Sequence, residues 1–314
     1  MNNKFGLALR SELYSPKEII DFARLADGSD EISHLFFPDI PVGSESIELS
    51  VASLAVTERV RIGSGVLRLS EHDPKILARR LETIQKISEN RFVLGVGVGS
   101  PGPRPRETIE TMFAQLEDTK KRFRSSGSSS SEHKVEIKFP EVFIATLRTG
   151  MARRSLSQAD GLLLNFCSPQ YAQRLISNLD GKVAEEGSSR KVSFACYVKI
   201  FFAKEQQTAD RLLIEEFVKY DNISQYHKMF EEDGVAPFMR TSRELLTMNQ
   251  SLEVPSELKE ISLSNPGKEE LFGMIQRFRT AGIDLPCVYP YFTPNEIGEY
   301  KMEVMKMILE SLRS

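Results

Sequence analysis

The chain has 314 residues, a length that lies within the range of a single α/β barrel domain. Its formal net charge of −3, with 27% charged residues, excludes the strongly basic surface of a typical nucleic-acid-binding protein. Its three cysteines are widely spaced, which argues against a disulfide framework. The N-terminal apolar stretch is too short for a signal peptide, and no apolar run reaches the length of about 18 residues that a membrane span needs. We therefore expect a cytoplasmic protein.

Strand and helix patterns alternate along the chain. Residues 5–9 predict a first strand, and Ser15-Pro16-Lys17-Glu18 is a capping box that predicts the start of the first helix. Further strands are expected near residues 34–37, 60–67, 92–94, 142–145, 161–165, 192–202 and 287–291. Helices are expected near residues 45–56, 74–87, 106–123, 151–158 and 169–179. A second capping box, Thr293-Pro294-Asn295-Glu296, predicts the start of the last helix.

Residues 59–100 form the most informative unit. Gly63-Ser64-Gly65 interrupts an apolar run, and glycines inside a strand mark a bulge or a close approach by another backbone or a ligand. Asp73 is a suitable N-cap and Pro74 suits the first position of the following helix. The apolar residues 92–94 then predict a strand that is covered on both faces. The unit is therefore a βαβ motif.

Eight strands separated by helices predict an α/β fold, specifically a (β/α)8 TIM barrel that occupies residues 1–314 as a single domain. An open doubly wound sheet is the alternative. The main irregularity is residues 205–265, where helical stretches at 209–220 and 224–232 form an insertion after strand seven. Because such excursions lie on the C-terminal face of a barrel, we expect this one to cover a ligand. The polar stretch 124–133 predicts a flexible surface connection.

Residues 97–102, GVGSPG, match the GxGxxG pattern of dinucleotide-binding folds. That site needs a helix to open within the turn, so that backbone amides face the pyrophosphate. Pro101, Pro103 and Pro105 oppose such a helix, and Glu117 and Asp118 lie within the next predicted helix instead of ending a strand. We therefore interpret the turn as the exit of a barrel strand.

The segments IGSGV, DPKILARRLETIQKISENRFVLGVGVG and VFIATLRTGMARRSLSQADGLLLN resemble the bacterial luciferase-like superfamily of flavin- and deazaflavin-dependent barrel enzymes. Residues 74–99 are the most specific part, because they match the pattern AR-x-x-x-T-x-x-x-I-S-x-x-R-x-x-LG-x-G-x-G. Residues 217–234 look like the helical insertion of these proteins. The first strand and the GVGVGS turn resemble most the methylenetetrahydromethanopterin reductase branch, which uses coenzyme F-420.

The resemblance implies a set of cofactor-binding positions at the strand exits. A bulge with a non-proline cis peptide is implied within residues 63–66, behind the ring of the cofactor. The strand-five exit is implied to hold the cofactor phosphate, and Arg153 and Arg154 either assist there or are solvent-facing charges. The implied cofactor-binding residues are Leu7, Ala8, Asp39, Ser64, Gly65, Val66, Val98, Gly99, Arg148, Thr149, Gly150, Met151 and Asn165. Asp39 can equally cap its own loop.

Three positions depart from the family pattern. Ala8 stands where the reductase branch carries a carboxylate, Ile40 where many relatives carry a histidine, and Ser100 where some deazaflavin dehydrogenases carry a glutamate. The proton donors implied by the resemblance are therefore absent. Glu12 and His72 either enter the site from the loops after strands one and three or are solvated.

The leading interpretation is an oxidoreductase that transfers a hydride between F-420 or FMN and a small organic substrate. One alternative is an FMN-dependent luciferase-like monooxygenase that receives reduced flavin from a partner reductase. The other is a non-catalytic flavin-binding paralogue, which the vacated acid–base positions favour. The resemblance also implies a homodimer. The four histidines, His34, His72, His133 and His227, show no metal-ligand spacing, and no Ser-His-Asp constellation is evident, so we expect no metal.

Overall fold

The computed structural model describes residues 4–99, 105–126, 136–185, 192–248, 253–294 and 296–313. Eight parallel strands close into a barrel, as predicted, with β6 pairing β7, β7 pairing β9 and β9 pairing β1. The barrel strands are β1 (Phe5–Ala8), β2 (Ile32–Phe37), β3 (Arg61–Arg68), β4 (Phe92–Gly97), β5 (Glu141–Ala145), β6 (Gly161–Asn165), β7 (Ser193–Phe201) and β9 (Leu285–Tyr291). The open doubly wound alternative is excluded by this closure.

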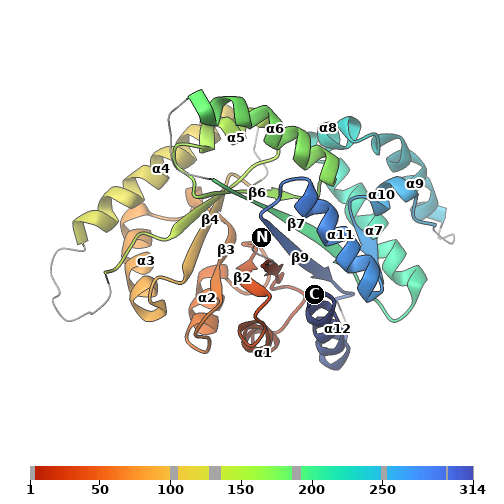
Figure 1. Cartoon of the computed structure of the whole chain (residues 1–314), viewed down its shortest axis with the longest axis horizontal. Helices are drawn as coiled ribbons and strands as arrows, with labels where there is room; N and C mark the ends of the chain where they lie inside the picture. Colours follow the sequence, from red (N-terminus) through yellow and green to blue (C-terminus); the bar gives the residue numbers. More distant parts are fainter. Residues whose placement is uncertain are drawn as a thin grey trace.

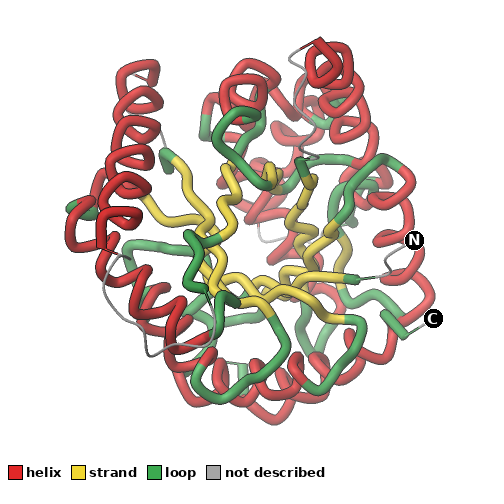
Figure 2. Tube along the Cα trace, turned by 60° about the vertical axis from the view of Figure 1, so that its left-hand side comes forward, coloured by secondary structure: helices red, strands yellow, loops and turns green. Residues whose placement is uncertain are grey.

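Helices surround the strands on the outside (Figures 1 and 2). Eight of them follow the barrel strands: α1 (Pro16–Asp27), α2 (Ser46–Leu54), α3 (Pro74–Ser88), α4 (Pro105–Ser126), α5 (Thr149–Ser155), α6 (Pro169–Glu185), α11 (Lys268–Thr280) and α12 (Gly298–Ser311). A short 3-10 turn, η1 (Leu69–Glu71), lies in the loop before α3. Of the connection expected at 124–133, residues 124–126 belong to α4 and the remainder lies outside the described residues.

The segment between β7 and α11, which we call the insertion, is rich in helices. It contains α7 (Gln206–Asp221), α8 (Ser224–Glu232), α9 (Ala236–Met248), α10 (Ser256–Lys259) and the two-residue strand β8 (Leu263–Ser264). These elements gather on one side of the molecule, beside β7 (Figure 1). β8 pairs in parallel with the end of β7, at Ile200 and Phe201.

The helix starts show which capping predictions hold. The Ser15 side chain accepts from the Glu18 amide and the Glu18 side chain accepts from the Ser15 amide, so the first capping box is confirmed. Asp73 caps α3, as predicted. The second capping box is wrong, because α12 begins at Gly298 after an Ile297 N-cap. The Thr293 hydroxyl donates to the Glu296 carboxylate instead of accepting a backbone amide.

Side chains fill the inside of the barrel. The Tyr197 hydroxyl on β7 donates to the Gly65 carbonyl on β3 over 3.1 Å, and these strands are not neighbours in the sheet. Phe36 packs between the rings of Tyr197 and Phe143, with centroid distances of 6.0 and 5.9 Å. A Cβ at Gly65 would overlap the Tyr197 hydroxyl. Glycine is therefore required where a large side chain crosses the interior, and the barrel is a packed core.

Candidate functional site

The C-terminal ends of the parallel strands meet at one end of the barrel, which we call the mouth. Active sites of barrel enzymes lie at this end because the loops that follow the strands converge there. The implied cofactor positions lie on six strands, β1 to β6, or in the loops directly after them. Ser100, which comes after β4 in the sequence, lies outside the described residues.

The bulge expected on β3 is present. The pairing of β3 with β4 shifts register between Ser64 and Leu67, and the peptide bond between Gly65 and Val66 is cis. The Ser64 hydroxyl donates to the Gly95 carbonyl over 2.9 Å. Val66 follows the bulge and is partly exposed at the mouth.

On β1, the two predicted residues lie on opposite faces. Gly6 shares a face with Cys287, which pairs with the interior residue Tyr197. Because side chains alternate along a strand, Ala8 also faces the interior and Leu7 faces the helices. Both are fully buried. Only Ala8 can contribute a side chain to the inner wall.

Polar groups from the exits of β2 and β3 lie close together, beside Gly99 at the exit of β4. Asp39 Oδ2 is 3.9 Å from Arg68 Nε, and Arg68 NH1 pairs with Glu71 over 2.8 Å. Burial raises the pKa of Asp39, opposed by the charge of Arg68, and burial lowers the pKa of His72, opposed by Asp39. A Cβ at Gly99, where φ is +65°, would lie 2.9 Å from the Arg68 side chain.

The exits of β5 and β6 lie against the insertion. Arg148 is the N-cap residue of α5, whose first residues are Thr149, Gly150 and Met151, and its NH1 pairs with Glu232 of α8 over 2.7 Å. A Cβ at Gly150 would meet nothing within 4 Å. This exit therefore has space, and its guanidinium already has a carboxylate partner.

Arg153 and Arg154 point to outer neighbours. Arg153 donates to the Asn178 carbonyl of α6 over 3.1 Å, and Arg154 pairs with Glu110 of α4 over 2.9 Å. Both side chains lie on the exposed face of α5. Their contacts favour the interpretation as solvent-facing charges.

Asn165 ends β6 and is held by α8. Its Nδ2 donates to the Tyr226 hydroxyl over 2.7 Å. Its Oδ1 is buried, and it has no hydrogen-bond partner among the residues that the structure describes. A buried acceptor without a donor is costly, so this atom suits a ligand that donates a hydrogen bond.

The mouth has an open side and a covered side. On the open side, over β3 to β6, Val66, Val98, Ala145 and Asn165 are partly exposed. On the covered side, over β7 and β9, the large side chains are buried, with exposures between 0 and 7% for Lys199, Phe201, Tyr289 and Tyr291. The partly exposed side chains named here thus lie over β3 to β6.

A buried charged cluster on the covered side was not predicted. We define it as Lys199, Glu216, Tyr291 and Arg10. Lys199 Nζ lies 2.6 Å from Glu216 Oε1 of α7, and the Tyr291 hydroxyl donates to the same oxygen over 3.0 Å. The signal available in the sequence was a lysine within the otherwise apolar run CYVKIFF. Its partner comes from the insertion, which only the tertiary structure brings near.

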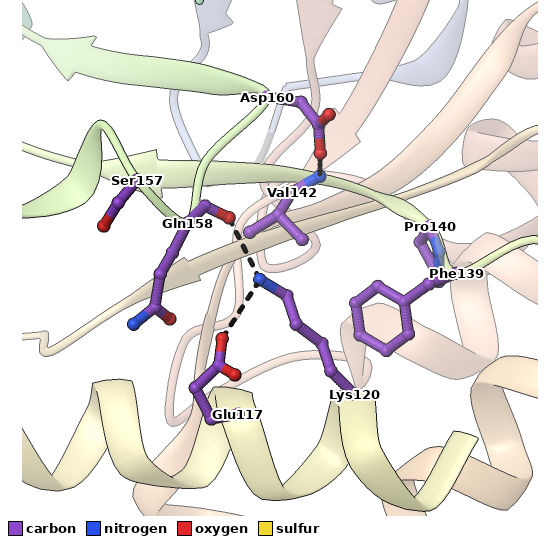
Figure 3. A pocket seen from close by; sticks show the side chains of 8 residues that line it. All are labelled: Glu117, Lys120, Phe139, Pro140, Val142, Ser157, Gln158 and Asp160. Atoms are coloured by element: carbon purple, nitrogen blue, oxygen red, sulfur yellow. Dashed lines mark hydrogen bonds and ion pairs between the residues drawn. The ribbon is translucent and has the colours of Figure 1, made fainter. Parts of the chain in front are cut away.

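A cavity of about 330 Å³ lies at the other end of the barrel (Figure 3). Lys120 of α4 crosses it and contacts the Gln158 carbonyl at 3.1 Å and Glu117 at 3.5 Å, while Asp160 accepts from the Val142 amide. These residues surround the N-terminal ends of β5 and β6. In barrels this end serves stability more often than catalysis.

No helix in the described ranges is long and apolar enough to cross a membrane. Over the same ranges, no group of three or more His, Cys, Asp or Glu side chains is arranged to hold a metal ion.

Comparison with known sequences identifies one family. The sequence model of the luciferase-like monooxygenase family matches residues 8–265. A 5,10-methylenetetrahydromethanopterin reductase from Archaeoglobus fulgidus is 26% identical over 151 residues, which are 43% of this chain and 45% of the reductase. The matched region thus spans less than half of that relative.

Comparison with solved structures shows the same fold. An F420-dependent secondary alcohol dehydrogenase, solved with an F420-acetone adduct, superimposes with a TM-score of 0.71 at 14% identity, covering 99% of this chain and 100% of that one. The oxygenating constituent of 3,6-diketocamphane monooxygenase from Pseudomonas putida, solved with FMN, gives 0.67 at 14% identity, covering 99% and 97%. With the family match over most of its length, the chain belongs to the luciferase-like monooxygenase family.

Proposed function

We propose that this protein is a deazaflavin- or FMN-dependent oxidoreductase that binds its cofactor on the open side of the mouth and acts on a small organic substrate. The observation that carries the proposal is the Asn165 Oδ1 atom, a buried acceptor without a described partner beside partly exposed small residues. The named cofactors of the similar structures, F420 and FMN, support the same reading.

The residues present fit such a cofactor. Asn165 would accept from a hydroxyl of its ribityl chain. Gly99 is exposed and Val66 is partly exposed, after β4 and on β3. Arg148 and Gly150 would face its phosphate, with the Arg148 guanidinium exchanging its ion pair with Glu232 for one with the phosphate. When bound, the cofactor supplies the hydride chemistry, and the chain supplies orientation and exclusion of water.

Titration of the purified protein with F-420 and with FMN, followed by visible absorption and fluorescence, tests the proposal. Asn165→Ala should weaken binding about 5-fold, because one buried hydrogen bond contributes about 1 kcal/mol. Tyr226→Phe is the matched control, since it removes the same internal hydrogen bond and retains the Asn165 acceptor. Failure of the wild-type protein to bind either cofactor would exclude both enzymatic functions.

An FMN-dependent monooxygenase is the second candidate, favoured by the description of the family and by the FMN-bound similar structure. It would need reduced flavin from a partner reductase. Oxygen uptake in the presence of FMN, a flavin reductase and a candidate substrate distinguishes it from a hydride-transferring enzyme. Cofactor binding without turnover in either assay would favour a non-catalytic paralogue.

A further inference from the structure

The buried charged cluster joins the barrel wall to the insertion. Lys199 is fully buried, and the Glu216 side chain is 8% exposed. The Lys199 ammonium also lies over four aromatic rings, at 3.7 Å from the Tyr220 centroid and 4.4 Å from that of Phe166, with Tyr289 and Tyr291 farther away. An ammonium at this depth is therefore held by one carboxylate and a set of rings.

Stability alone does not explain this arrangement. Replacing a buried ion pair by apolar side chains of similar volume is often neutral or stabilising, since the desolvation of both charges opposes their attraction. Aromatic side chains already surround the position and would pack well against an apolar residue. A role for the charge itself is the more economical explanation.

The cluster continues from Lys199 toward the loop after β1. Tyr291 ends β9, and its hydroxyl lies between the Glu216 carboxylate at 3.0 Å and Arg10 NH1 at 3.3 Å. Arg10 also pairs with Glu12 over 2.7 Å, and the Glu12 side chain is 28% exposed. The other oxygen of Glu216 lies 3.6 Å from the exposed Lys219. The cluster thus has a buried centre and two contacts with solvent-facing groups.

The cluster lies nearer the mouth than Tyr197, the β7 residue whose hydroxyl reaches the bulge of β3. Tyr197 precedes Lys199 by two residues on the same face of β7, and its hydroxyl contacts Gly65. Two residues along a strand correspond to about 7 Å. Tyr289 pairs with Lys199 on the neighbouring strand β9. The cluster therefore occupies the interior layer next to the proposed cofactor site.

The chemistry of the members differs in one respect. Arg10 remains charged and does not release a proton in proteins, whereas an ammonium and a phenol both can. The hydroxyl of Tyr291 accepts from Arg10 and donates to Glu216, so one carboxylate oxygen joins the ammonium to a residue that ends β9 at the mouth end of the barrel. Proton transfer along this link needs only short steps.

We propose that Tyr291 hands a proton to the substrate and that Lys199, acting through Glu216, replaces it. The proposal rests on the proposed function. A hydride, with its electron pair, passes from the reduced deazaflavin or flavin to the carbon of a C=O or C=N bond, so the cofactor is oxidised and the substrate reduced. The substrate oxygen or nitrogen takes the Tyr291 proton, Lys199 returns one to the phenolate through Glu216, and solvent restores the ammonium through Lys219.

The role assigns a substrate class: small molecules with a polarised C=O or C=N bond. It also places the acid function on β7 and β9 and not at Ala8 or Ile40, where the family resemblance led us to expect it. Tyr291 is the catalytic residue in this scheme. Lys199 and Glu216 are positioning residues, because they act through it.

Single-turnover reduction of acetone and benzaldehyde by the protein loaded with reduced F-420 tests the scheme. Tyr291→Phe and Lys199→Met should each slow the step about 100-fold, the usual contribution of a general acid, while cofactor binding changes less than about 2-fold. Lys199→Arg should not restore the rate, since arginine retains the charge without donating the proton. A solvent isotope effect present in the wild type should change in both slow variants.

Lys301→Met is the matched control. Lys301 is a buried lysine of α12 that donates to the Leu13 carbonyl over 2.6 Å and lies outside the cluster. This variant should lose stability and retain the wild-type rate. In cofactor-free protein labelled with ¹⁵N-lysine, the Nζ resonance that disappears in Lys199→Met should shift in Tyr291→Phe, which reports the network independently of turnover.

The outcomes separate the two proposals. If the wild type binds neither cofactor, the proposed function falls and the acid role falls with it. If the wild type binds F-420 and reduces neither probe, the acid role alone is overturned and cofactor binding stands. If the wild type reduces a probe and Tyr291→Phe retains its rate, the acid role alone is overturned. Rescue of Lys199→Met by Lys199→Arg would likewise overturn Lys199 as the proton source and leave it a structural charge.

Discussion

Gly65 is the residue at which the bulge of β3 meets the interior of the barrel. An added Cβ would overlap the Tyr197 hydroxyl and crowd Phe36. Gly65→Ala should therefore reduce the free energy of unfolding by about 1–3 kcal/mol, the usual cost of overpacking a core. Urea denaturation monitored by circular dichroism measures the loss.

The Tyr197→Phe background provides the control for this steric explanation. Removal of the hydroxyl opens space next to Gly65 and also removes the hydrogen bond to its carbonyl. The cost of Gly65→Ala should then be smaller in Tyr197→Phe than in the wild type, as a double-mutant cycle measures. Equal costs in the two backgrounds would show that Tyr197 is not the obstacle.

Glu216 makes stability depend on acid pH. Burial would raise the pKa of its carboxyl, but the charge and hydrogen bond of Lys199 outweigh burial and lower that pKa to about 2. A carboxyl with a depressed pKa contributes stability above its unfolded pKa and loses it as pH falls toward the folded value. We expect this contribution to disappear between about pH 4.5 and pH 2.

Unfolding measured across that pH window tests this linkage. Glu216→Gln should be less stable at neutral pH, because Lys199 is left as a buried charge without a carboxylate, and should lose less stability on acidification. Glu215→Gln is the control, since Glu215 is an exposed neighbour on α7 that pairs with Arg211. If the free energy of unfolding of Glu216→Gln fell with decreasing pH as steeply as that of the wild type, Glu216 would not be the source of the acid sensitivity.

Sequence reasoning placed several mouth residues but not their partners. Asp39, Gly99 and Asn165 could be located because strand exits are visible as small or polar residues after apolar runs. The Lys199–Glu216 pair could not, since 17 positions separate residues whose contact depends on how α7 folds back. The resemblance implied that the adjacent residues Leu7 and Ala8 both contact the cofactor. The two-residue period of a strand allows only one of them to face the barrel interior.

At the scale of elements, the Asp233 carboxylate, at the end of α8, forms hydrogen bonds with residues at the start of α6. Its side chain is 2% exposed and accepts from the Ser168 hydroxyl over 2.8 Å, the Ser168 amide over 3.2 Å and Arg174 over 2.8 Å. Asp233→Ala should release α8 locally, because three hydrogen bonds with a charged acceptor are lost. Hydrogen exchange of α8 amides should accelerate at least about 10-fold.

The exposed Glu231→Gln variant is the control for that measurement, since Glu231 precedes Asp233 by two residues and lies on the outer surface. Exchange in β1 to β4 should be unchanged in both variants. If α8 in Asp233→Ala kept its wild-type protection, the insertion would be held mainly by its apolar contacts, such as Phe230 against Phe166.

The periodic elements were predicted and the short ones were not. Strands of the barrel are apolar on both faces and the outer helices carry one apolar stripe, so their patterns are visible locally. β8 has two residues, and its pairing with β7 is set by the fold. α12 begins later than its capping box suggested, because Thr293 uses its hydroxyl as a donor.

At the scale of the whole molecule, the reactivity of the cysteine thiols measures whether the barrel is folded. Cys167, Cys196 and Cys287 are fully buried, and burial raises the pKa of the Cys287 thiol well above its usual range. We expect negligible reaction with a thiol reagent in the folded protein and three reactive thiols after denaturation. Rapid labelling of the folded protein, timed by absorbance, would contradict this expectation.

The two sides of the mouth also have a stereochemical consequence. Because Tyr197, Tyr289 and the charged cluster fill the side over β7 and β9, a flat ring over β3 to β6 would turn one face toward the strands and only the other toward the substrate. A substrate between that ring and Tyr291 would receive hydride and proton from fixed directions. Reduction of a prochiral substrate would then give one enantiomer, with its handedness set by the barrel and not by the loops.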